Sequence, residues 1–323
     1  GSAASAEQTD ASIRSAVMGM ALGLSASLSS EGLASHATLL FTGCKVALDS
    51  FSRLRVGRAG ADNDENMVLR ERCYSLLEEI AGKCPMVAMG DPQIIAVLFK
   101  LLDHEDERLS PRLYAALGSL RDVYKERASL LAKEKAEAET LELTAMPEGE
   151  ETGERAMDQE EDSTAAPHSP SNVEIESVIA PIPVSSALSA DEGAALRDVL
   201  QSASRSPESK KRLAALQWAR AVFDWQSITL EALELLVDDS SETVNHLARR
   251  EFVSLQSFLA SSPELDSGDS GKKEGNTEHH KVLVAVLRMI QSPSDAFLDP
   301  KRPRARRELF KCAGNWEKKC VLI

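Results

Sequence analysis

Aromatic residues are scarce in this chain, at 4% of its residues, and the sequence motifs of several enzyme classes are missing. There is no GxxxxGK[ST] or GxGxxG phosphate-binding loop, no GxSxG nucleophile motif and no HExxH zinc motif. Hydrophobic residues make up 43% of the chain, and leucine and small residues dominate among them. This composition favours helix-on-helix packing over a β-sandwich, which needs more Val, Ile, Tyr and Phe. We therefore predict an all-α protein that is not an enzyme.

Paired cysteines and histidines with metal-ligand spacing are also lacking. No CxxC pair occurs, and the odd number of cysteines predicts reduced thiols in an intracellular compartment: Cys44, Cys73, Cys84, Cys312 and Cys320. Cys73 and Cys84 lie eleven residues apart on one predicted helix face, about 16 Å, which is too far for a disulfide. We interpret both as small core residues in a helix seam. No histidine is spaced for zinc, so no metal or cofactor is predicted.

Positive charge is in short supply, because the formal net charge is −14. A non-specific nucleic-acid binder needs a basic face, so the balance argues against nucleic acid as a partner. The local exception is "KRPRARR", with Lys301, Arg302, Arg304, Arg306 and Arg307. This run is either a nuclear import or anion-binding patch, or a solvated tail that offsets some of the acidity.

Long hydrophobic runs are absent as well. The apolar stretch "AVMGMALGLSASL" is too short to span a bilayer, and the sequence predicts a soluble protein. The last four residues, "CVLI", fit the C-a-a-X prenylation pattern at Cys320, with Lys318 and Lys319 just before it. The alternative is a chance match or a truncated end. A membrane is predicted as a partner only if Cys320 is prenylated.

Composition divides the chain into four regions. We predict helical repeats at residues 1–132 and a disordered acidic linker at residues 133–190. Further helical repeats are predicted at residues 191–292, with a polar loop near 261–280, and a basic tail at residues 293–323. The linker holds few large apolar residues, so it cannot bury enough surface to offset its chain entropy.

The two helical regions share a pattern of two helices, an acidic turn and a further helix. The turn "LLDHEDERL" at 101–109 corresponds to "LLVDDSSETV" at 235–244. Such recurring pairs predict a HEAT- or armadillo-like α-solenoid (an ARM-type fold) interrupted by the acidic linker. Trp218 and Trp225 are interpreted as core filling at a repeat junction, with a peptide-binding groove as the alternative.

Two segments with this pattern resemble one family, the proteasome adaptor and scaffold proteins, which are very long HEAT-repeat proteins. The first runs from "RERCYSLLEEIAGKCP" through "GDPQIIAVLFKLLDHEDERLSPRLYAALGSLRDVY", and the second is "KRLAALQWARAVFDWQSITLEALELLVDDSSETVNHLARREF". They occur in the order expected for the family. The acidic linker at 133–190 resembles an insertion or a variable loop, and the basic tail and "CVLI" are not recognised as features of that family. The proteins of the family are several times longer, so this chain is expected to be an internal piece or a shortened form.

The resemblance implies a non-catalytic scaffold that binds the regulatory and core particles of the proteasome and tethers or stabilises them. It implies no catalytic residues. Arg70, Arg72, Arg249 and Arg250 are interpreted as exposed: either as solvated helix faces, which is the favoured interpretation, or as ridges that meet acidic partner surfaces. The expected location is the cytoplasm, with the nucleus as a second one. The alternatives are a peripheral membrane tether prenylated at Cys320, and a generic helical-repeat protein that binds cargo.

Overall fold

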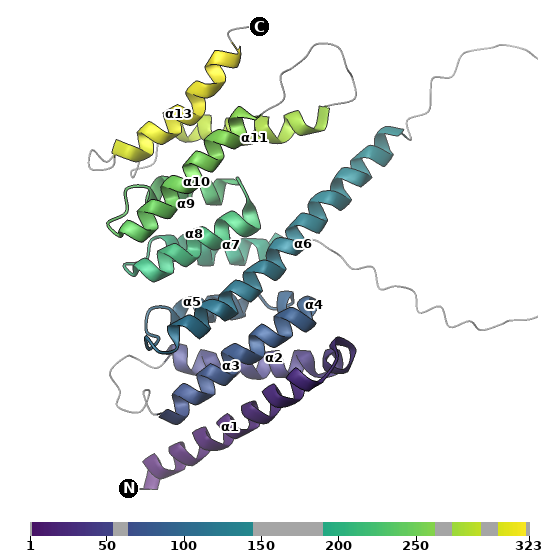
Figure 1. Ribbon diagram of the computed structural model, residues 1–323, viewed down its shortest axis with the longest axis vertical. Coiled ribbons are helices and arrows are strands. Elements are labelled where there is room, and N and C mark those ends of the chain that lie inside the picture. Colours follow the sequence, from purple (N-terminus) through teal and green to yellow (C-terminus); the bar gives the residue numbers. More distant parts are fainter. Residues whose placement is uncertain (1, 54–63, 145–189, 262–272, 292–302, 321–323) are drawn as a thin grey trace, which may run out of the picture. The chain divides into compact units, whose positions relative to one another are not determined.

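The computed structural model describes the backbone of residues 2–53, 64–144, 190–261, 273–291 and 303–320, and the side chains of 12–53, 64–130, 191–261, 279–291 and 303–314. Within these ranges every regular element is a helix (Figure 1). The helices are α1 (Ser2–Ser27), α2 (Ser30–Arg53), α3 (Asp64–Lys83), α4 (Pro85–Met89), α5 (Gln93–Leu101), α6 (Ser110–Thr144), α7 (Ala190–Ser204), α8 (Ser209–Phe223), α9 (Ser227–Leu236), α10 (Glu242–Ala260), α11 (Lys273–Gln291) and α13 (Pro303–Cys320). The all-α prediction is confirmed for the described residues.

Local sequence explains most of the helix boundaries. The sequence predicts that the helix before Pro85 ends there, and α3 does end at Lys83. Pro85 is also the first residue of the short helix α4. The sequence predicts Asp91 as the N-cap of α5 and Pro92 as its first residue, whereas the N-cap is Pro92 and the helix begins at Gln93. The Asp91 carboxylate still accepts the Gln93 N–H, at 3.0 Å. Apolar residues at helical spacing form the buried face of α2: Leu33, Ala37, Phe41, Cys44 and Leu48.

Three segments are more helical than predicted. Helix α6 continues to Thr144, beyond the expected end at 132, because "EKAEAETLEL" is rich in strong helix formers. Helix α11 begins at Lys273, inside the polar loop expected near 261–280. Residues 303–320 form α13 rather than a tail. The rest of the predicted acidic linker, residues 145–189, lies outside the described residues.

The chain divides into two compact units, residues 1–128 with 188–323, and residues 129–187. Both predicted helical regions therefore contribute to the first unit. The boundaries predicted for four separate regions stay predictions.

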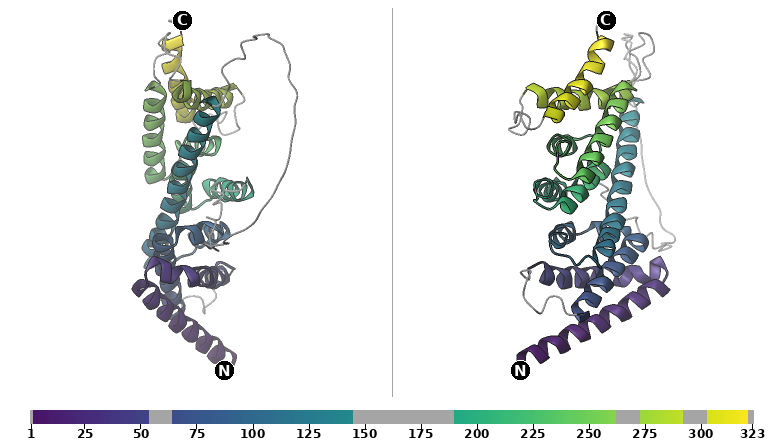
Figure 2. Two further views of the ribbon diagram at one scale, coloured as in Figure 1. Left: turned by 90° about the vertical axis from the view of Figure 1, so that its right-hand side faces the viewer. Right: turned by 60° about the vertical axis from the view of Figure 1, so that its left-hand side comes forward.

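Helices of the first unit pack in chain order along two rows (Figures 1 and 2). In one row, α2 contacts α5, α5 contacts α7, and α7 contacts α9. In the other, α1 contacts α3, while α8 contacts α10 and α10 contacts α13. Neighbours along the chain, such as α2 with α3, α7 with α8 and α8 with α9, join the two rows.

Two buried apolar clusters fill the space between the rows. The first extends from α2 to the start of α9 and includes Tyr74, Phe99, Tyr124 and Trp218. The second extends from α8 to α13 and includes Trp225, Phe252 and Leu309. Because α8 contributes Trp218 to the first cluster and Leu216 to the second, it links the two cores. Trp218 and Trp225 are 2% and 5% exposed, which confirms that both are core residues.

The acidic turn after α5 connects three helices. The Arg70 guanidinium of α3 donates to Glu105 Oε1 at 3.1 Å, and Tyr74 donates to the other oxygen of the same carboxylate. Asp103, in the same turn, accepts from Lys211 Nζ of α8 at 2.7 Å. Glu105 thus pairs with α3, which precedes the turn, and Asp103 pairs with α8, which follows it.

The acidic turn after α9 repeats this arrangement. Arg212 of α8 donates twice to the Asp239 carboxylate, at 2.6 and 2.7 Å. Asp238 accepts the backbone N–H groups of Arg304 and Ala305, both at 3.1 Å, at the start of α13. The two turns that look alike in sequence therefore make equivalent connections, backward to a buried arginine and forward to a later helix.

Candidate partner-binding surface

Helices α6, α8 and α10 line an open cleft of about 480 Å³. Its lining holds four cationic and two acidic side chains beside apolar and amide groups: Arg121, Asp122, Lys125, Leu216, Gln217, Arg220, Ala221, Leu247, Arg250 and Glu251. We call these residues the α6–α8–α10 groove. Its excess of cations contrasts with the net charge of −14 for the whole chain, so the groove is suited to an acidic partner surface.

Ion pairs within the protein hold several of the charged side chains that line this groove. Arg220 Nε lies 3.2 Å from Glu251 Oε2, and Arg250 Nη2 lies 3.2 Å from Glu251 Oε1. The Arg220 guanidinium also stacks on the Trp225 ring, 3.8 Å from its centroid, and pairs with Asp224. The side chain of Glu251 is only 13% exposed, whereas that of Arg250 is 65% exposed. Arg220 is therefore a fixed part of the wall, and Arg250 reaches outward where a partner can meet it.

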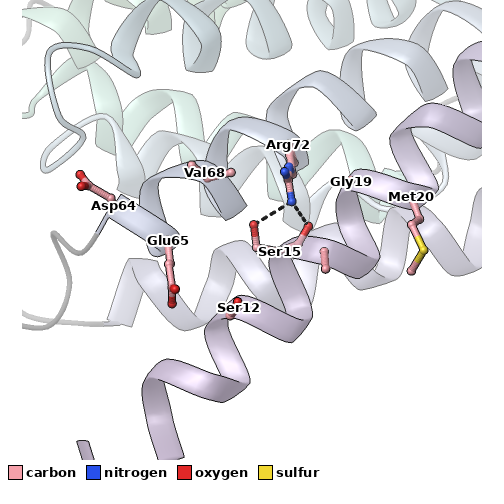
Figure 3. Close-up of a pocket in the computed structure, with 9 residues that line it drawn as sticks. Ser12, Ser15, Gly19, Met20, Asp64, Glu65, Val68 and Arg72 are labelled. Atoms are coloured by element: carbon pink, nitrogen blue, oxygen red, sulfur yellow. Dashed lines mark hydrogen bonds between the residues drawn. The ribbon is translucent and has the colours of Figure 1, made fainter. Parts of the chain in front are cut away.

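A second open cleft, of about 600 Å³, lies between α1 and α3 (Figure 3). In it Arg72 points toward α1 and donates to the Ser15 hydroxyl at 2.9 Å and to the Ser15 carbonyl (Figure 3). Gly19 leaves room for this contact, because a Cβ there would lie 3.0 Å from the Arg72 guanidinium carbon. Arg72 therefore joins two helices and is not available to a partner.

The expectation of four exposed arginine ridges is wrong for two of them. Arg70 is 5% exposed and held by Glu105, and Arg72 is half-buried against Ser15. The two side chains leave α3 on different sides, because residues i and i+2 of a helix do not share a face: Arg70 meets Glu105 in the turn after α5, and Arg72 meets Ser15 of α1. The helical period alone does not show that both sides of α3 are covered by neighbouring elements. Arg249 and Arg250 are exposed, as predicted.

The described cysteines are free thiols in the core, namely Cys44, Cys73, Cys84 and Cys312. The hydrogen bond with Cys73, together with burial, holds the pKa of the Cys44 thiol well above its usual range. Burial raises the pKa of Cys312 to about 12. A thiol that stays protonated is a weak nucleophile and a poor metal ligand. The interpretation of Cys73 and Cys84 as packing residues is confirmed by their burial, at 0% and 7% exposure.

The described part of the predicted basic segment is helical. Ala305, Leu309 and Cys312 are buried on one side of α13, while Arg304 and Arg307 are exposed and Arg306 is half-buried. Lys301 and Arg302 lie outside the described residues. The described part of "KRPRARR" is therefore the start of a packed amphipathic helix, and an import role stays a prediction.

Cys320 is the last residue of α13, and the three residues after it lie outside the described range. Its lipidation stays a prediction. No helix among the described residues is long and apolar enough to cross a bilayer. Among the described side chains, no group of three or more His, Cys, Asp or Glu residues is placed to hold a metal ion. The His279 ring stacks on Phe258, with 4.2 Å between centroids, as a packing residue.

Sequence reasoning missed most of the α6–α8–α10 groove. Arg121 and Lys125 lie one helical turn apart on α6, and this spacing is the single local signal that they share a face. Arg220 and Arg250 join them only because α8 and α10 pack beside one another. No short motif links residues that lie about 30 and 100 positions apart in the sequence.

The comparisons with known proteins gave one match. A profile of the family described as "Proteasome component ECM29, N-terminal" matches residues 5–236. No curated protein and no solved structure matches the chain. The matched range extends from within α1 to the end of α9 and includes the residues between α6 and α7, which the sequence suggested to be an insertion or a variable loop. Because the match covers well over half of the chain, this chain belongs to the proteasome component ECM29 family.

Proposed function

We propose that this chain is a non-catalytic scaffold segment that binds the proteasome and helps to hold its regulatory and core particles together. The observation that carries this proposal is family membership, since the family is described as a proteasome component. The structure supports a role in binding, because its described clefts are wide and open and one of them is lined by exposed cations.

We infer that the helices form a HEAT- or ARM-type solenoid. Helix pairs α1–α2, α3–α5, α6–α7, α8–α9 and α10–α11 would be successive repeats, with the residues 145–189 inserted inside the third. The two rows of helices and the equivalent acidic turns support this assignment. In such an array each repeat contacts only its neighbours, so long ridges of side chains stay available to a large partner.

The α6–α8–α10 groove is the surface that we assign to the partner. Arg250 and Lys125 are exposed, and the groove carries positive charge in an otherwise acidic chain. An acidic surface of the proteasome would be attracted to this groove and repelled by the remainder of the chain, which fixes the orientation of the encounter. The reduced core thiols and the basic segment of α13 support a cytoplasmic location, with the nucleus as a second one.

Direct binding of the purified chain to purified proteasome tests this proposal. We expect binding that weakens with rising salt, because exposed charge pairs are screened. The double variant Lys125→Glu with Arg250→Glu should weaken binding about tenfold or more, since each reversal replaces attraction by repulsion. Arg53→Glu is the control for reversal of a surface charge, because Arg53 is also exposed, at 77%, on α2 and lies outside the groove.

The outcomes separate the two parts of the proposal. If the folded wild-type chain does not bind regulatory or core particles, the function proposed for this segment is wrong. If it binds and both charge reversals leave the affinity unchanged, the function stands and the groove is not the contact surface.

A further inference from the structure

The turn between α7 and α8 carries an accessible Ser206–Pro207 dipeptide. Pro207 and the flanking Arg205 and Glu208 are exposed, and Ser206 is half-buried. Ser206 lines two open clefts, one of about 730 Å³ toward the α5–α6 turn and one of about 460 Å³ toward the α9–α10 turn. Its Oγ accepts the Glu208 N–H at 3.2 Å, so the hydroxyl lies at the protein surface and does not pack in the core.

Arg212 binds the backbone of this same dipeptide. Its Nη1 donates to the carbonyl oxygens of Ser206 at 2.8 Å and Pro207 at 2.6 Å. Its Nε and Nη2 donate to the Asp239 carboxylate at 2.6 and 2.7 Å. The side chains of Arg212 and Asp239 are 12% and 6% exposed. One guanidinium therefore connects the Ser206 turn to the turn after α9.

The neighbouring residue makes the corresponding connection in the other direction. Lys211 Nζ donates to Asp103 Oδ2 at 2.7 Å, which joins α8 to the turn after α5. Two adjacent cations near the start of α8 thus hold it to the turns on both sides. Both lie within one or two helical turns of Ser206, and Lys211 lines the same cleft as Ser206.

We propose that Ser206 is a phosphorylation site for a proline-directed Ser/Thr kinase, and that its phosphate loosens α8 from the neighbouring acidic turns. The γ-phosphoryl group of ATP is transferred to Ser206 Oγ, the bond to the β-phosphate oxygen breaks, and ADP and the hydroxyl proton are released. The proposal is independent of proteasome binding.

Charge decides the direction of the effect. The phosphate adds a charge of about −1.5 to −2 at neutral pH and three strong acceptors. The clefts beside Ser206 hold more carboxylates than cations: Asp103, Asp198, Glu208, Asp238 and Asp239, against Arg205, Lys211 and Arg212, with His104 as a further titratable group. A phosphate that draws Arg212 or Lys211 leaves Asp239 or Asp103 without its partner and repels the others. We therefore expect phosphorylation to destabilise this region.

The sequence contains five Ser-Pro dipeptides, and two of them lie among the described residues, at Ser110 and at Ser206. The structure distinguishes Ser206 from Ser110. Ser110–Pro111 lies within the first turn of α6, where Ser110 Oγ donates to the Asp106 carbonyl at 3.2 Å. A helical backbone does not offer the extended conformation that a kinase cleft binds. Ser110 therefore serves as the internal control for accessibility.

The test uses the folded full chain, ATP and a purified proline-directed kinase, with site-resolved mass spectrometry. A synthetic peptide of residues 200–213 shows whether the sequence is a substrate without the fold. We expect phosphate on Ser206 in the peptide and in the folded chain, with Ser110 modified much more slowly. Phosphorylation of the peptide but not of the folded chain, or of neither, would overturn the assignment of the site.

Thermal unfolding tests the consequence. We expect the chain phosphorylated at Ser206 to unfold at a Tm about 3 °C lower or more, while Ser206→Ala treated with the same kinase shows no such decrease. The kinase-treated Ser206→Ala variant corrects for phosphate added at other serines. A phosphorylated chain whose Tm equals that of this control would overturn the proposed loosening of α8.

Discussion

At the residue scale, Asp224 has the unusual backbone. Among the described residues, it is the one non-glycine residue with a positive φ, 46°, and it follows directly after α8. This conformation lies in a sparsely populated region for an L-residue and costs on the order of 1 kcal/mol. The Arg220 guanidinium pairs with its carboxylate, but the Asp224 side chain is 65% exposed, so the pair contributes little.

Asp224→Gly is expected to stabilise the protein. Glycine relieves the strain at positive φ and loses only an exposed ion pair. Asp224→Ala is the matched control, because it loses the same ion pair and keeps the strain. We expect the glycine variant to exceed the alanine variant by about 1 kcal/mol in the free energy of unfolding, measured by urea denaturation. Equal stability of the two variants would show that the turn is not strained.

Glu78 on α3 is a second residue in an unfavourable position. Burial raises the pKa of its carboxyl, Arg112 opposes this effect, and Glu79 adds to it. One of its oxygens is buried and has no hydrogen-bond partner in the structure. Because the pKa is raised in the folded state, ionisation of Glu78 opposes folding. The associated gain in stability is present at low pH and is lost as the pH rises through the folded-state pKa.

Glu78→Gln should therefore raise Tm at neutral pH. The expected gain in the free energy of unfolding is below about 1 kcal/mol, since the site is partly exposed. The gain should disappear below about pH 4, where the parent carboxyl is protonated in both states. Glu79→Gln is the control, because Glu79 pairs with Lys83 at 3.3 Å and should gain nothing. A gain that persisted at low pH would show that charge is not its cause.

At the element scale, the acidic turns hold consecutive helices together. The Arg70 and Glu105 side chains are 6% and 2% exposed, so this ion pair is excluded from water. Removing one partner of such a pair leaves the other charge buried without compensation. Glu105 additionally accepts the Tyr74 hydroxyl, and burial and this contact hold the pKa of Tyr74 well above its usual range.

Glu105→Ala should destabilise the chain by about 3–5 kcal/mol, measured by urea denaturation. The double variant Arg70→Met with Glu105→Ala should recover part of this loss, because it removes the unpaired charge and keeps apolar volume at Arg70. Asp49→Ala breaks the pair with Arg53, which is 77% exposed, and should cost less than about 1 kcal/mol. A Glu105→Ala effect as small as that of Asp49→Ala would contradict the role given to the turn.

At the scale of the whole molecule, one core joins sequence segments on both sides of residues 145–189. Trp218 of α8 lies between Phe99 of α5 and Tyr124 of α6, with ring centroids 6.3 and 5.8 Å away. The same buried cluster includes Leu196 and Leu200 of α7. Neither segment can bury these side chains alone.

A chain cut once within residues 145–189 should therefore stay together. We expect limited proteolysis to give two fragments that elute as one species in size-exclusion chromatography, because their shared core remains intact. Trp218→Ala should separate the fragments, since truncating a buried Trp costs about 3–5 kcal/mol. Phe310→Ala is the control, because Phe310 is 55% exposed on α13. Separation of the wild-type fragments would contradict a buried cluster shared by both fragments.

Much of the helical fold follows from local sequence. The apolar stripes at Cys73–Cys84 and Leu113–Tyr124 were predictable because a helix repeats its faces at fixed spacing, and both stripes are buried. The similarity of the two acidic turns was also evident from the sequence. The residues that bind these turns could not be predicted, because Lys211 and Arg304 come from distant parts of the chain.

The sequence by itself determined the all-α class, the core cysteines and tryptophans, and the family, because these depend on composition, helical period and the order of local patterns. Only the tertiary structure decided which arginines are exposed. Arg70 and Arg250 look alike in sequence, yet one is buried against Glu105 and the other reaches into the α6–α8–α10 groove. The physical reason is that a side chain is buried or exposed by the helices packed against it, and that packing brings together residues far apart in the chain.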